Sequence, residues 1–292
     1  MDSQITFHFK FNFHTPILPY SHTLMKHIPN IFTLLNLFFG CIAVICILQN
    51  GITIIYSADG TQFADIPERI WLAPLFIGLA AVADFLDGFL ARLLKQNSPL
   101  GRELDSLADI VSFGVAPGLI IYQFLRMSFM RQEDGADVSM IWLLPALILP
   151  CAAAYRLAVF NLDTTQSKSF KGIPVPAVGL MVASFPLIYW IRNNEWAMNF
   201  LFNKWALYNW VLYLLFNKWA LYAIVILLSY GMVNRRPMLS LKFGGKNDPQ
   251  LLPRLILILL ALIAIIFLQW LAVPLIFLFY IVISLLFKNR IA

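Results

Sequence analysis

The stretch ADFLDGFLARLLKQNSPLGRELDSLADIVSFGVAPG, residues 83–118, places four aspartates at helical spacing among apolar residues. Its first half lays five residues along one stripe of a helix at i, i+3, i+4, i+7 and i+8, namely Asp84, Asp87, Gly88, Ala91 and Arg92. After a break at residues 97–99, its second half lays four more along another stripe at i, i+4, i+8 and i+11, namely Gly101, Asp105, Asp109 and Ser112. The spacing predicts two facing helices that present four carboxylates to one pocket.

The composition around this stretch is that of a membrane protein. Residues of the AVILMFWYC set make up 60% of the 292 residues and charged residues only 12%, against roughly a quarter charged in an ordinary soluble domain. This excludes a disordered chain and a soluble globular enzyme. Apolar runs of about 18 to 25 residues can cross a hydrocarbon core as helices, because lipid tolerates no unpaired backbone. The fold class is therefore all-α and polytopic, with eight spans expected near 28–48, 70–94, 104–126, 141–160, 174–191, 214–233, 251–268 and 270–287.

The spans divide the chain into four parts. These are a leader of unknown role (1–27), a six-helix membrane core (28–233), a basic cytoplasmic loop (234–250) and a C-terminal helical hairpin (251–292). The apolar stretch 251–287 cannot be one straight span, because 37 residues would rise about 55 Å. A tight turn is therefore expected near Gln269 and Trp270.

Two segments have no role that the pattern assigns. Residues 1–24 lack the basic and apolar regions of a signal peptide, so we expect their deletion to leave membrane insertion and activity unchanged, with Met25 as the effective start. The octapeptide LFNKWALY occurs at 201–208 and again at 215–222. It is interpreted as a local duplication that extends an aromatic segment at the outer membrane interface, formed by Trp196, Trp205, Tyr208, Trp210 and Tyr213.

Basic residues collect on one set of loops and predict the orientation in the membrane. Thirteen Lys and Arg residues flank the spans on one side and five on the other. The richer side is expected in the cytoplasm with both chain ends, which places the active site at the cytoplasmic face of the inner membrane. The excess of basic residues is thus no sign of a nucleic-acid partner. The three cysteines lie in apolar segments without metal-ligand spacing and indicate packing: Cys41, Cys46 and Cys151.

The four aspartates indicate a metal site for phosphoryl chemistry. An acid at the bilayer centre costs roughly 2.5 to 3.5 kcal/mol, so four of them require compensation. Two divalent cations, Mg²⁺ or Mn²⁺, would cancel the formal charge and prefer oxygen ligands. Gly88 and Ala91 leave room for a ligand, and Arg92 can pair with a phosphate. Two metal ions beside a guanidinium are an arrangement used for phosphoryl transfer.

At this point the stretch resembles a known family. DGFLAR, eight residues and GRELDSLAD match the CDP-alcohol phosphotransferase signature D-x2-D-G-x2-A-R-x8-G-x3-D-x3-D at every fixed position. Further stretches are similar to the bacterial phosphatidylserine synthase branch of that family: IPNIFTLLNLFFG, DSLADIVSFGVAPG, YRLAVFN and FKGIPVPA.

The resemblance implies a reaction and a role for each signature residue. The phosphatidyl group of CDP-diacylglycerol would pass to the hydroxyl of L-serine, with release of CMP, in a setting of membrane lipid. Asp84, Asp87 and Asp105 would be metal ligands, and Asp109 either a ligand or the base that takes the hydroxyl proton. The positions that accommodate the CDP moiety would be Gly88, Ala91, Arg92 and Gly101.

Other polar residues are weaker candidates. Asn30, Thr33 and Asn36 form a stripe in the first span that could bond the nucleotide, although helix packing explains it equally well. Ser112 continues the second stripe toward the same pocket. Arg156 and Lys171 could hold a phosphate or the serine carboxylate, or could reach lipid headgroups instead.

Two alternatives remain open at this stage. The acceptor could be glycerol 3-phosphate or an inositol phosphate, which would require additional basic residues. In a different class, the acids could form the ion path of a transporter, which predicts acids spread through the membrane depth and broken helices. The preferred metal and the oligomeric state, with a homodimer as one candidate, also stay open.

Overall fold

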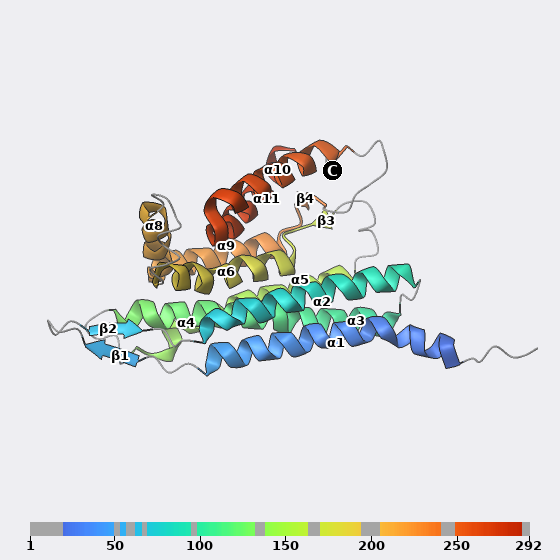
Figure 1. Cartoon of the computed structure of the whole chain (residues 1–292), viewed down its shortest axis with the longest axis horizontal. Coiled ribbons are helices and arrows are strands. Elements are labelled where there is room, and N and C mark those ends of the chain that lie inside the picture. The colour runs from blue at the N-terminus through green and yellow to red at the C-terminus, as the bar shows by residue number, and fades with distance from the viewer. Residues whose placement is uncertain are drawn as a thin grey trace, which may run out of the picture.

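The computed structural model describes residues 20–49, 53–56, 62–65, 69–94, 98–131, 138–162, 170–193, 205–240 and 249–287. Helices dominate these residues (Figure 1), namely α1 (Tyr20–Leu48), α2 (Ala73–Leu93), α3 (Pro99–Asp109), α4 (Ala116–Met130), α5 (Ile148–Leu162), α6 (Val175–Asn193), α8 (Trp205–Leu215), α9 (Lys218–Val233), α10 (Leu251–Leu268) and α11 (Ala272–Leu286). A π-helical segment, Ile110–Val115, joins α3 to α4 without a break. The predicted all-α membrane fold is confirmed.

Short elements complete the described chain. Two antiparallel strand pairs form, β1 (Thr53–Tyr56) with β2 (Gln62–Asp65) and β3 (Phe170–Lys171) with β4 (Pro237–Met238). Four 3-10 turns precede or separate helices, at Ile70–Leu72, Met140–Trp142, Leu144–Leu147 and Gln269–Leu271. The segment 234–250, predicted as a loop, therefore contains a strand that pairs with the end of the loop before α6.

Five described stretches are long and apolar enough to cross a membrane: 29–48, 70–93, 99–130, 144–162 and 251–286. A sixth results if α8 and α9, which meet at an angle of 82°, are one bent span. Each of the eight predicted segments is helical, but α6 offers only a 17-residue apolar helix, 175–191. The count of eight separate spans thus stays a prediction.

Helix boundaries differ from the predicted ones at three places. Helix α1 begins at Tyr20, eight residues before the predicted start, because no Gly or Pro interrupts residues 20–28. The helix that carries Asp105 begins at Pro99 and runs on through α4 to Met130. The predicted span 214–233 is broken, because the Asn217 side chain caps α9 by accepting from the Trp219 N–H at 2.9 Å.

The C-terminal stretch turns where it was expected to. Gln269 ends α10 with φ 49°, the single positive φ among the described non-glycine residues. The 3-10 turn Gln269–Leu271 then leads into α11, whose third residue is Pro274. Proline is tolerated there because the first N–H groups of a helix have no intrahelical partner.

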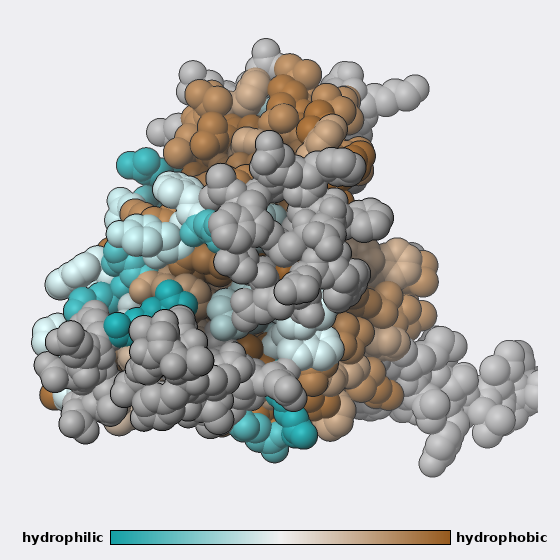
Figure 2. All heavy atoms as spheres, turned by 60° about the vertical axis from the view of Figure 1, so that its left-hand side comes forward, coloured by the Kyte–Doolittle hydropathy of each residue, from teal (hydrophilic) through white to brown (hydrophobic). Residues whose placement is uncertain are grey.

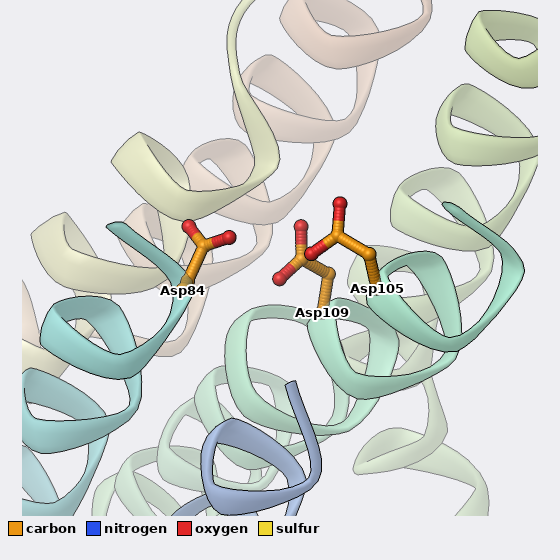
Figure 3. Close-up of side chains that lie close together, drawn as sticks. All are labelled: Asp84, Asp105 and Asp109. Carbon is orange, nitrogen blue, oxygen red and sulfur yellow. The ribbon is translucent and has the colours of Figure 1, made fainter. Parts of the chain in front are cut away.

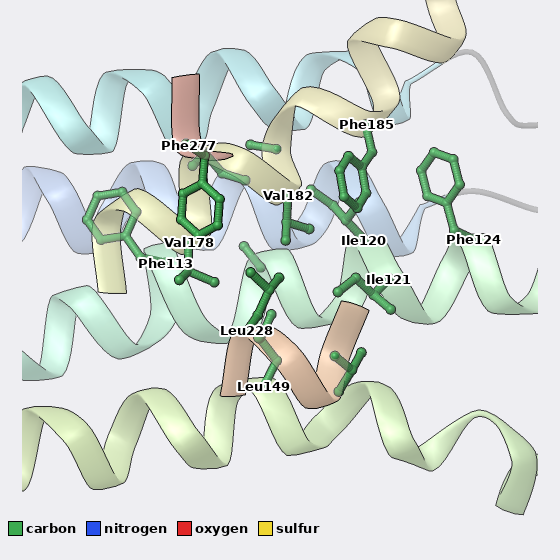
Figure 4. Close-up of a cluster of buried hydrophobic side chains, with 14 of the residues drawn as sticks. Phe113, Ile120, Ile121, Phe124, Leu149, Val178, Val182, Phe185, Leu228 and Phe277 are labelled. Carbon is green, nitrogen blue, oxygen red and sulfur yellow. The ribbon is translucent and has the colours of Figure 1, made fainter. Parts of the chain in front are cut away.

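A continuous apolar core joins these helices. Figure 4 shows side chains from the π-helical segment, α4, α5, α6, α9 and α11 meeting in one cluster, among them Phe113, Phe124, Leu149, Val182, Leu228 and Phe277. Part of the outer surface is apolar as well: brown residues cover the C-terminal hairpin at the top of Figure 2, whereas hydrophilic residues gather on the left of this view. Helices whose buried and outward faces are both apolar are typical of a protein that lies in lipid.

The repeat lies on α8 and α9. Its second copy, 215–222, crosses the bend between them, while residues 201–204 of the first copy lie outside the described residues, as does Trp196. Trp210 and Tyr213 are exposed, as expected of an aromatic interface segment. Tyr208 is not: it is fully buried, and its hydroxyl donates to the Leu268 carbonyl at 3.3 Å. The interface assignment of Tyr208 was therefore wrong, because the C-terminal hairpin packs over it.

Candidate active site

Three aspartates converge between α2 and α3. Figure 3 shows Asp84 pointing from α2 toward Asp105 and Asp109, which stand one turn apart on α3. One carboxylate oxygen of each lies within 4.8 Å of the other two. Asp109 is buried, and Asp84 and Asp105 are half-buried. Three negative charges at this separation repel one another strongly unless cations compensate them.

The start of α3 sets the position of its two acids. Ser98 caps the helix by accepting a hydrogen bond from the Gly101 N–H at 2.9 Å, and Pro99 occupies the first helical position. A side chain at position 101 would lie 3.0 Å from Ser98 Oγ and 3.1 Å from Asn30 Oδ1. Glycine there lets α3 begin close against α1, so that Asp105 and Asp109 face α2.

Asp87 lies beside this cluster, outside its three oxygen atoms. It is buried at 6% exposure and accepts a hydrogen bond from Thr33 Oγ1 at 2.7 Å. Thr33 also donates toward the Pro29 carbonyl in its own helix, at 3.2 Å. Thr33 therefore binds Asp87, a predicted metal ligand, and both residues line the pocket beside the cluster. The role of Asp87 as a metal ligand stays a prediction.

Asp109 is hydrogen-bonded to a residue of α1. Asn36 Nδ2 donates to Asp109 Oδ1 at 3.1 Å, and Ser112 Oγ donates to the Asn36 carbonyl at 3.0 Å. Asn36 and Ser112 are fully buried and do not line the pocket that adjoins the acids. Ser112, the third residue of the π-helical segment, therefore shares its partner Asn36 with Asp109.

A pocket of about 320 Å³ opens next to the acids. Its walls come from α1, α2 and the start of α3, and its lining residues are Pro29, Asn30, Thr33, Asp87, Gly88, Ala91, Arg92, Ser98, Gly101, Arg102 and Asp105. All four residues predicted to accommodate the CDP moiety are among them, as are two of the weaker candidates, Asn30 and Thr33. Sequence reasoning missed Pro29, Ser98 and Arg102. The pairing of Ser98 with Pro99 was the signal for a helix start that could have placed Ser98 here.

A second, smaller pocket lies between α5, β3 and the end of α9. It contains both remaining candidates, Arg156 and Lys171, and adds Arg235. Arg156 is buried at 7% exposure on α5, whereas Arg235 is exposed. Sequence reasoning used Arg235 only to orient the chain, because residues 171 and 235 come together only through the pairing of β3 with β4.

The acid cluster fits a divalent cation. Its donor atoms are carboxylate oxygens from two helices, the ligand type that Mg²⁺ and Mn²⁺ prefer. Asp105 Oδ1 is buried and has no hydrogen-bond partner among the described residues. A buried polar atom without a partner is costly, and a bound cation would supply that partner. Asp84 and Asp105 would hold the ion, with Asp109 beside it either as a third ligand or as the base, and the ion would orient a phosphate group and stabilise its developing charge.

The surrounding residues suit a ligand with a pyrophosphate. Arg92 and Arg102, two exposed arginines, line the pocket together with Asp87 and Asp105. Arginine binds phosphate oxygens with two parallel hydrogen bonds. Gly88 has no protein atom nearer its missing side chain than Arg92 Nη1, at 3.6 Å, so the wall beside Asp87 is open to a ligand.

Comparisons with known proteins point to one family. The sequence profile described as CDP-alcohol phosphatidyltransferase matches residues 26–229. The chain is 36% identical over 156 residues to the CDP-diacylglycerol--serine O-phosphatidyltransferase of Helicobacter pylori (strain J99). This alignment covers 53% of this chain and 54% of that protein. It is 30% identical over 171 residues to the protein of the same name from Bacillus subtilis (strain 168), covering 56% of this chain and 78% of that protein.

A more distant organism has a similar protein. The CDP-diacylglycerol--serine O-phosphatidyltransferase of Saccharomyces cerevisiae is 34% identical over 165 residues, covering 53% of this chain and 52% of that protein. The alignments thus span about half the length of the Helicobacter and yeast relatives. The matched region 26–229 includes α2, α3 and the whole lining of the first pocket. It includes the second pocket except the lining residues 232–235.

Proposed function

The chain belongs to the CDP-alcohol phosphatidyltransferase family, and from that premise we propose that it transfers the phosphatidyl group of CDP-diacylglycerol to the hydroxyl of L-serine. The products are phosphatidylserine and CMP. One observation carries the proposal: the three-carboxylate cluster adjoins a pocket lined by every residue of the signature that the resemblance assigns to the nucleotide.

The residues divide the work between holding the donor and activating the acceptor. Arg92 and Arg102 pair with the pyrophosphate, and Gly88, Ala91 and Gly101 leave room for the cytidine. Asp109 takes the proton of the serine hydroxyl, which is a poor nucleophile until that proton is removed. The hydroxyl oxygen then bonds to the lipid-side phosphorus while the bond from that phosphorus to the oxygen retained by CMP breaks. Two divalent cations, Mg²⁺ or Mn²⁺, are proposed to neutralise the four aspartates when bound.

Serine is proposed as the acceptor for two reasons. The Helicobacter, Bacillus and yeast relatives are named for serine. The second pocket offers Arg156, Lys171 and Arg235, which can pair with the carboxylate of an amino acid. The same three cations suit the extra phosphate of glycerol 3-phosphate or an inositol phosphate, so the acceptor is decided by experiment.

The transporter alternative lacks support in the described helices. It predicts acids spread through the membrane depth, yet within the described helices every Asp and Glu lies on α2 or α3. Acids that gather on one pair of helices favour a binding site over an ion path across the membrane.

The proposed location is the inner membrane, with the acids and both chain ends at the cytoplasmic side. The support is the basic residue count of thirteen against five and the need for a soluble nucleotide product to leave. A reporter fused after Ala292 should read as cytoplasmic. A periplasmic reading would show that the spans of 251–286 were counted wrongly.

The function is tested by measuring CMP release from purified protein supplied with CDP-diacylglycerol, Mg²⁺ or Mn²⁺ and one alcohol at a time. We expect release with L-serine and formation of phosphatidylserine. Faster release with glycerol 3-phosphate or inositol phosphate would move the chain to another acceptor within the family. No release with any acceptor would refute the proposal.

A further inference from the structure

The C-terminal hairpin, α10 and α11, lies outside the family match, which ends at residue 229. Figure 1 shows it above α6, against which α11 packs, with β4 beside it. The proposed chemistry assigns this hairpin no role. Its buried polar residues nevertheless converge on a single stretch of chain, residues 237–240.

Helix α11 binds both backbone groups of Leu239, its N–H and its carbonyl. Tyr280 OH donates to the Leu239 carbonyl at 3.2 Å, and Ser284 Oγ accepts from the Leu239 N–H at 3.2 Å. Tyr280 is 6% exposed, Ser284 0% and Leu239 1%. Because buried polar groups are costly without partners, these two contacts fix the position of Leu239 against α11.

The α10 side binds the next residue. Arg254 Nε donates to the Ser240 carbonyl at 2.5 Å, and Gln250 Oε1 accepts from both the Ser240 N–H, at 3.2 Å, and Arg254 Nη2, at 3.1 Å. Arg254 is only 3% exposed. A cation within an apolar helix is expensive and is retained where it has a function; here it binds the end of the β4 segment.

The β4 segment in turn binds the loop that carries Lys171. Met238 pairs with Phe170 and Pro237 with Lys171. The Gly172 N–H donates to the Arg236 carbonyl at 2.9 Å. Gly172 has φ +75°, and a side chain there would lie 2.7 Å from the carbonyl oxygens of Met232 and Asn234, so only glycine permits this close pairing.

These contacts end at the second pocket. Lys171 lies at the pairing position on β3, Arg235 lies two residues before β4, and both line the pocket with Arg156. The three residues Arg156, Lys171 and Arg235 are called the basic wall below. Arg156 is held by α5 of the core, whereas the other two are positioned by the β3 and β4 pairing.

We propose that the C-terminal hairpin clamps β4 through Tyr280, Ser284 and Arg254 and thereby positions Lys171 and Arg235 of the basic wall for the anionic group of the acceptor. Tyr280, Ser284 and Arg254 are positioning residues, because they line neither pocket, and Tyr280 in addition lies close to Arg156 of the basic wall. The identity of the acceptor rests on the proposed function; the clamp itself does not.

The test uses the full-length protein and the double variant Tyr280→Phe/Ser284→Ala, which removes both contacts to Leu239 and little volume. The matched control is Tyr208→Phe, which removes the hydrogen bond to Leu268 at the opposite end of the same hairpin. Backbone amide exchange is measured by mass spectrometry, with Gly172, the residue directly after β3, as the reporter. The KM values for L-serine and CDP-diacylglycerol and the kcat are measured in parallel.

We expect faster exchange at Gly172 in the double variant and exchange like the parent's in Tyr208→Phe. The KM for L-serine should rise about 5- to 25-fold, which corresponds to one or two net hydrogen bonds, while the KM for CDP-diacylglycerol and kcat stay within about twofold. Arg254→Lys, which keeps the charge, should be affected less than Arg254→Gln. Exchange at Gly172 that matches the parent's would overturn the clamp. Faster exchange with an unchanged KM for L-serine would overturn its link to the acceptor. If the parent protein released no CMP with any acceptor, the proposed function would fail and amide exchange alone would decide the clamp.

Discussion

The side-chain amide of Asn36 on α1 donates to the carboxylate of Asp109 on α3, at 3.1 Å between Nδ2 and Oδ1. Ser112, three residues beyond Asp109, donates to the backbone carbonyl of the same Asn36 at 3.0 Å. Helix α1 is therefore joined to α3 and to the π-helical segment by a pair of buried hydrogen bonds around the acid proposed as the base. This connection orients Asp109 from outside the pocket.

Asn36→Ala should lower kcat about 10- to 100-fold, because hydrogen bonds to charged groups are worth about 1.5–3 kcal/mol and this one orients Asp109. The control is Asn161→Ala, which removes a side-chain hydrogen bond to Ser106 on the same helix, at 3.0 Å, without touching an acid. Steady-state CMP release measures both. Equal losses in the two variants would show that Asn36 acts only through general packing.

Asp109→Asn should lower the rate at least ~100-fold while CDP-diacylglycerol and metal still bind near the parent's affinity. The amide keeps the shape of the carboxylate and loses its basicity, and a positioned general base contributes about 10²- to 10⁴-fold. Equilibrium binding and single-turnover rates separate the two effects. Loss of metal binding, with a rate that higher metal concentration restores, would make Asp109 a ligand and require another base.

Activity should require a divalent cation and vanish in excess chelator, because three carboxylates share one small space. Asp84→Ala, Asp87→Ala and Asp105→Ala should each abolish turnover. Titration with Mn²⁺, followed by its electron paramagnetic resonance, counts the ions. If Asp87 binds a second ion beside the cluster, Asp87→Ala should remove one of two bound ions and Asp84→Ala should weaken the other. Full activity in chelator would contradict the metal site.

Gly40→Ala should reduce activity and thermal stability together. Gly40 is buried where α1 meets the π-helical segment, and an added methyl would lie 3.0 Å from Ser112 Cα and nearer still to Ser112 Oγ. Relief requires Ser112 to move, which breaks its bond to Asn36 and shifts the neighbouring Asp109. Overpacking of this kind costs typically about 1–3 kcal/mol.

Gly78→Ala serves as the control for this substitution, since nothing lies within 4 Å of the methyl that it adds. Thermal unfolding and CMP release on both variants give the comparison. A Gly40→Ala protein as stable and active as Gly78→Ala would show that α1 and the π-helical segment separate without consequence.

The sequence by itself determined the membrane helices and the signature residues of the pocket beside the acids, Gly88, Ala91, Arg92 and Gly101. Apolar runs in lipid have almost no alternative to helix, because unpaired backbone groups find no water there. Local spacing was enough to bring Gly88, Ala91 and Arg92 onto one face, since residues three and four apart on a helix are neighbours whatever surrounds them. The start of α3 at the Ser98 and Pro99 cap likewise brought Gly101 to the same pocket.

The tertiary structure decided what depends on contacts between distant segments. Regular spacing treats Asp84 and Asp87 alike, yet only Asp84 joins Asp105 and Asp109, whereas Asp87 accepts a hydrogen bond from Thr33 on α1. No local signal predicted the π-helical segment or the contact between Ser112 and Asn36. The same holds for Arg254, one of the thirteen basic residues counted on the cytoplasmic side, which is buried and donates to the Ser240 carbonyl. Helical periodicity predicts which face of a helix a residue occupies. Which residue it contacts on that face depends on how the other helices pack against it.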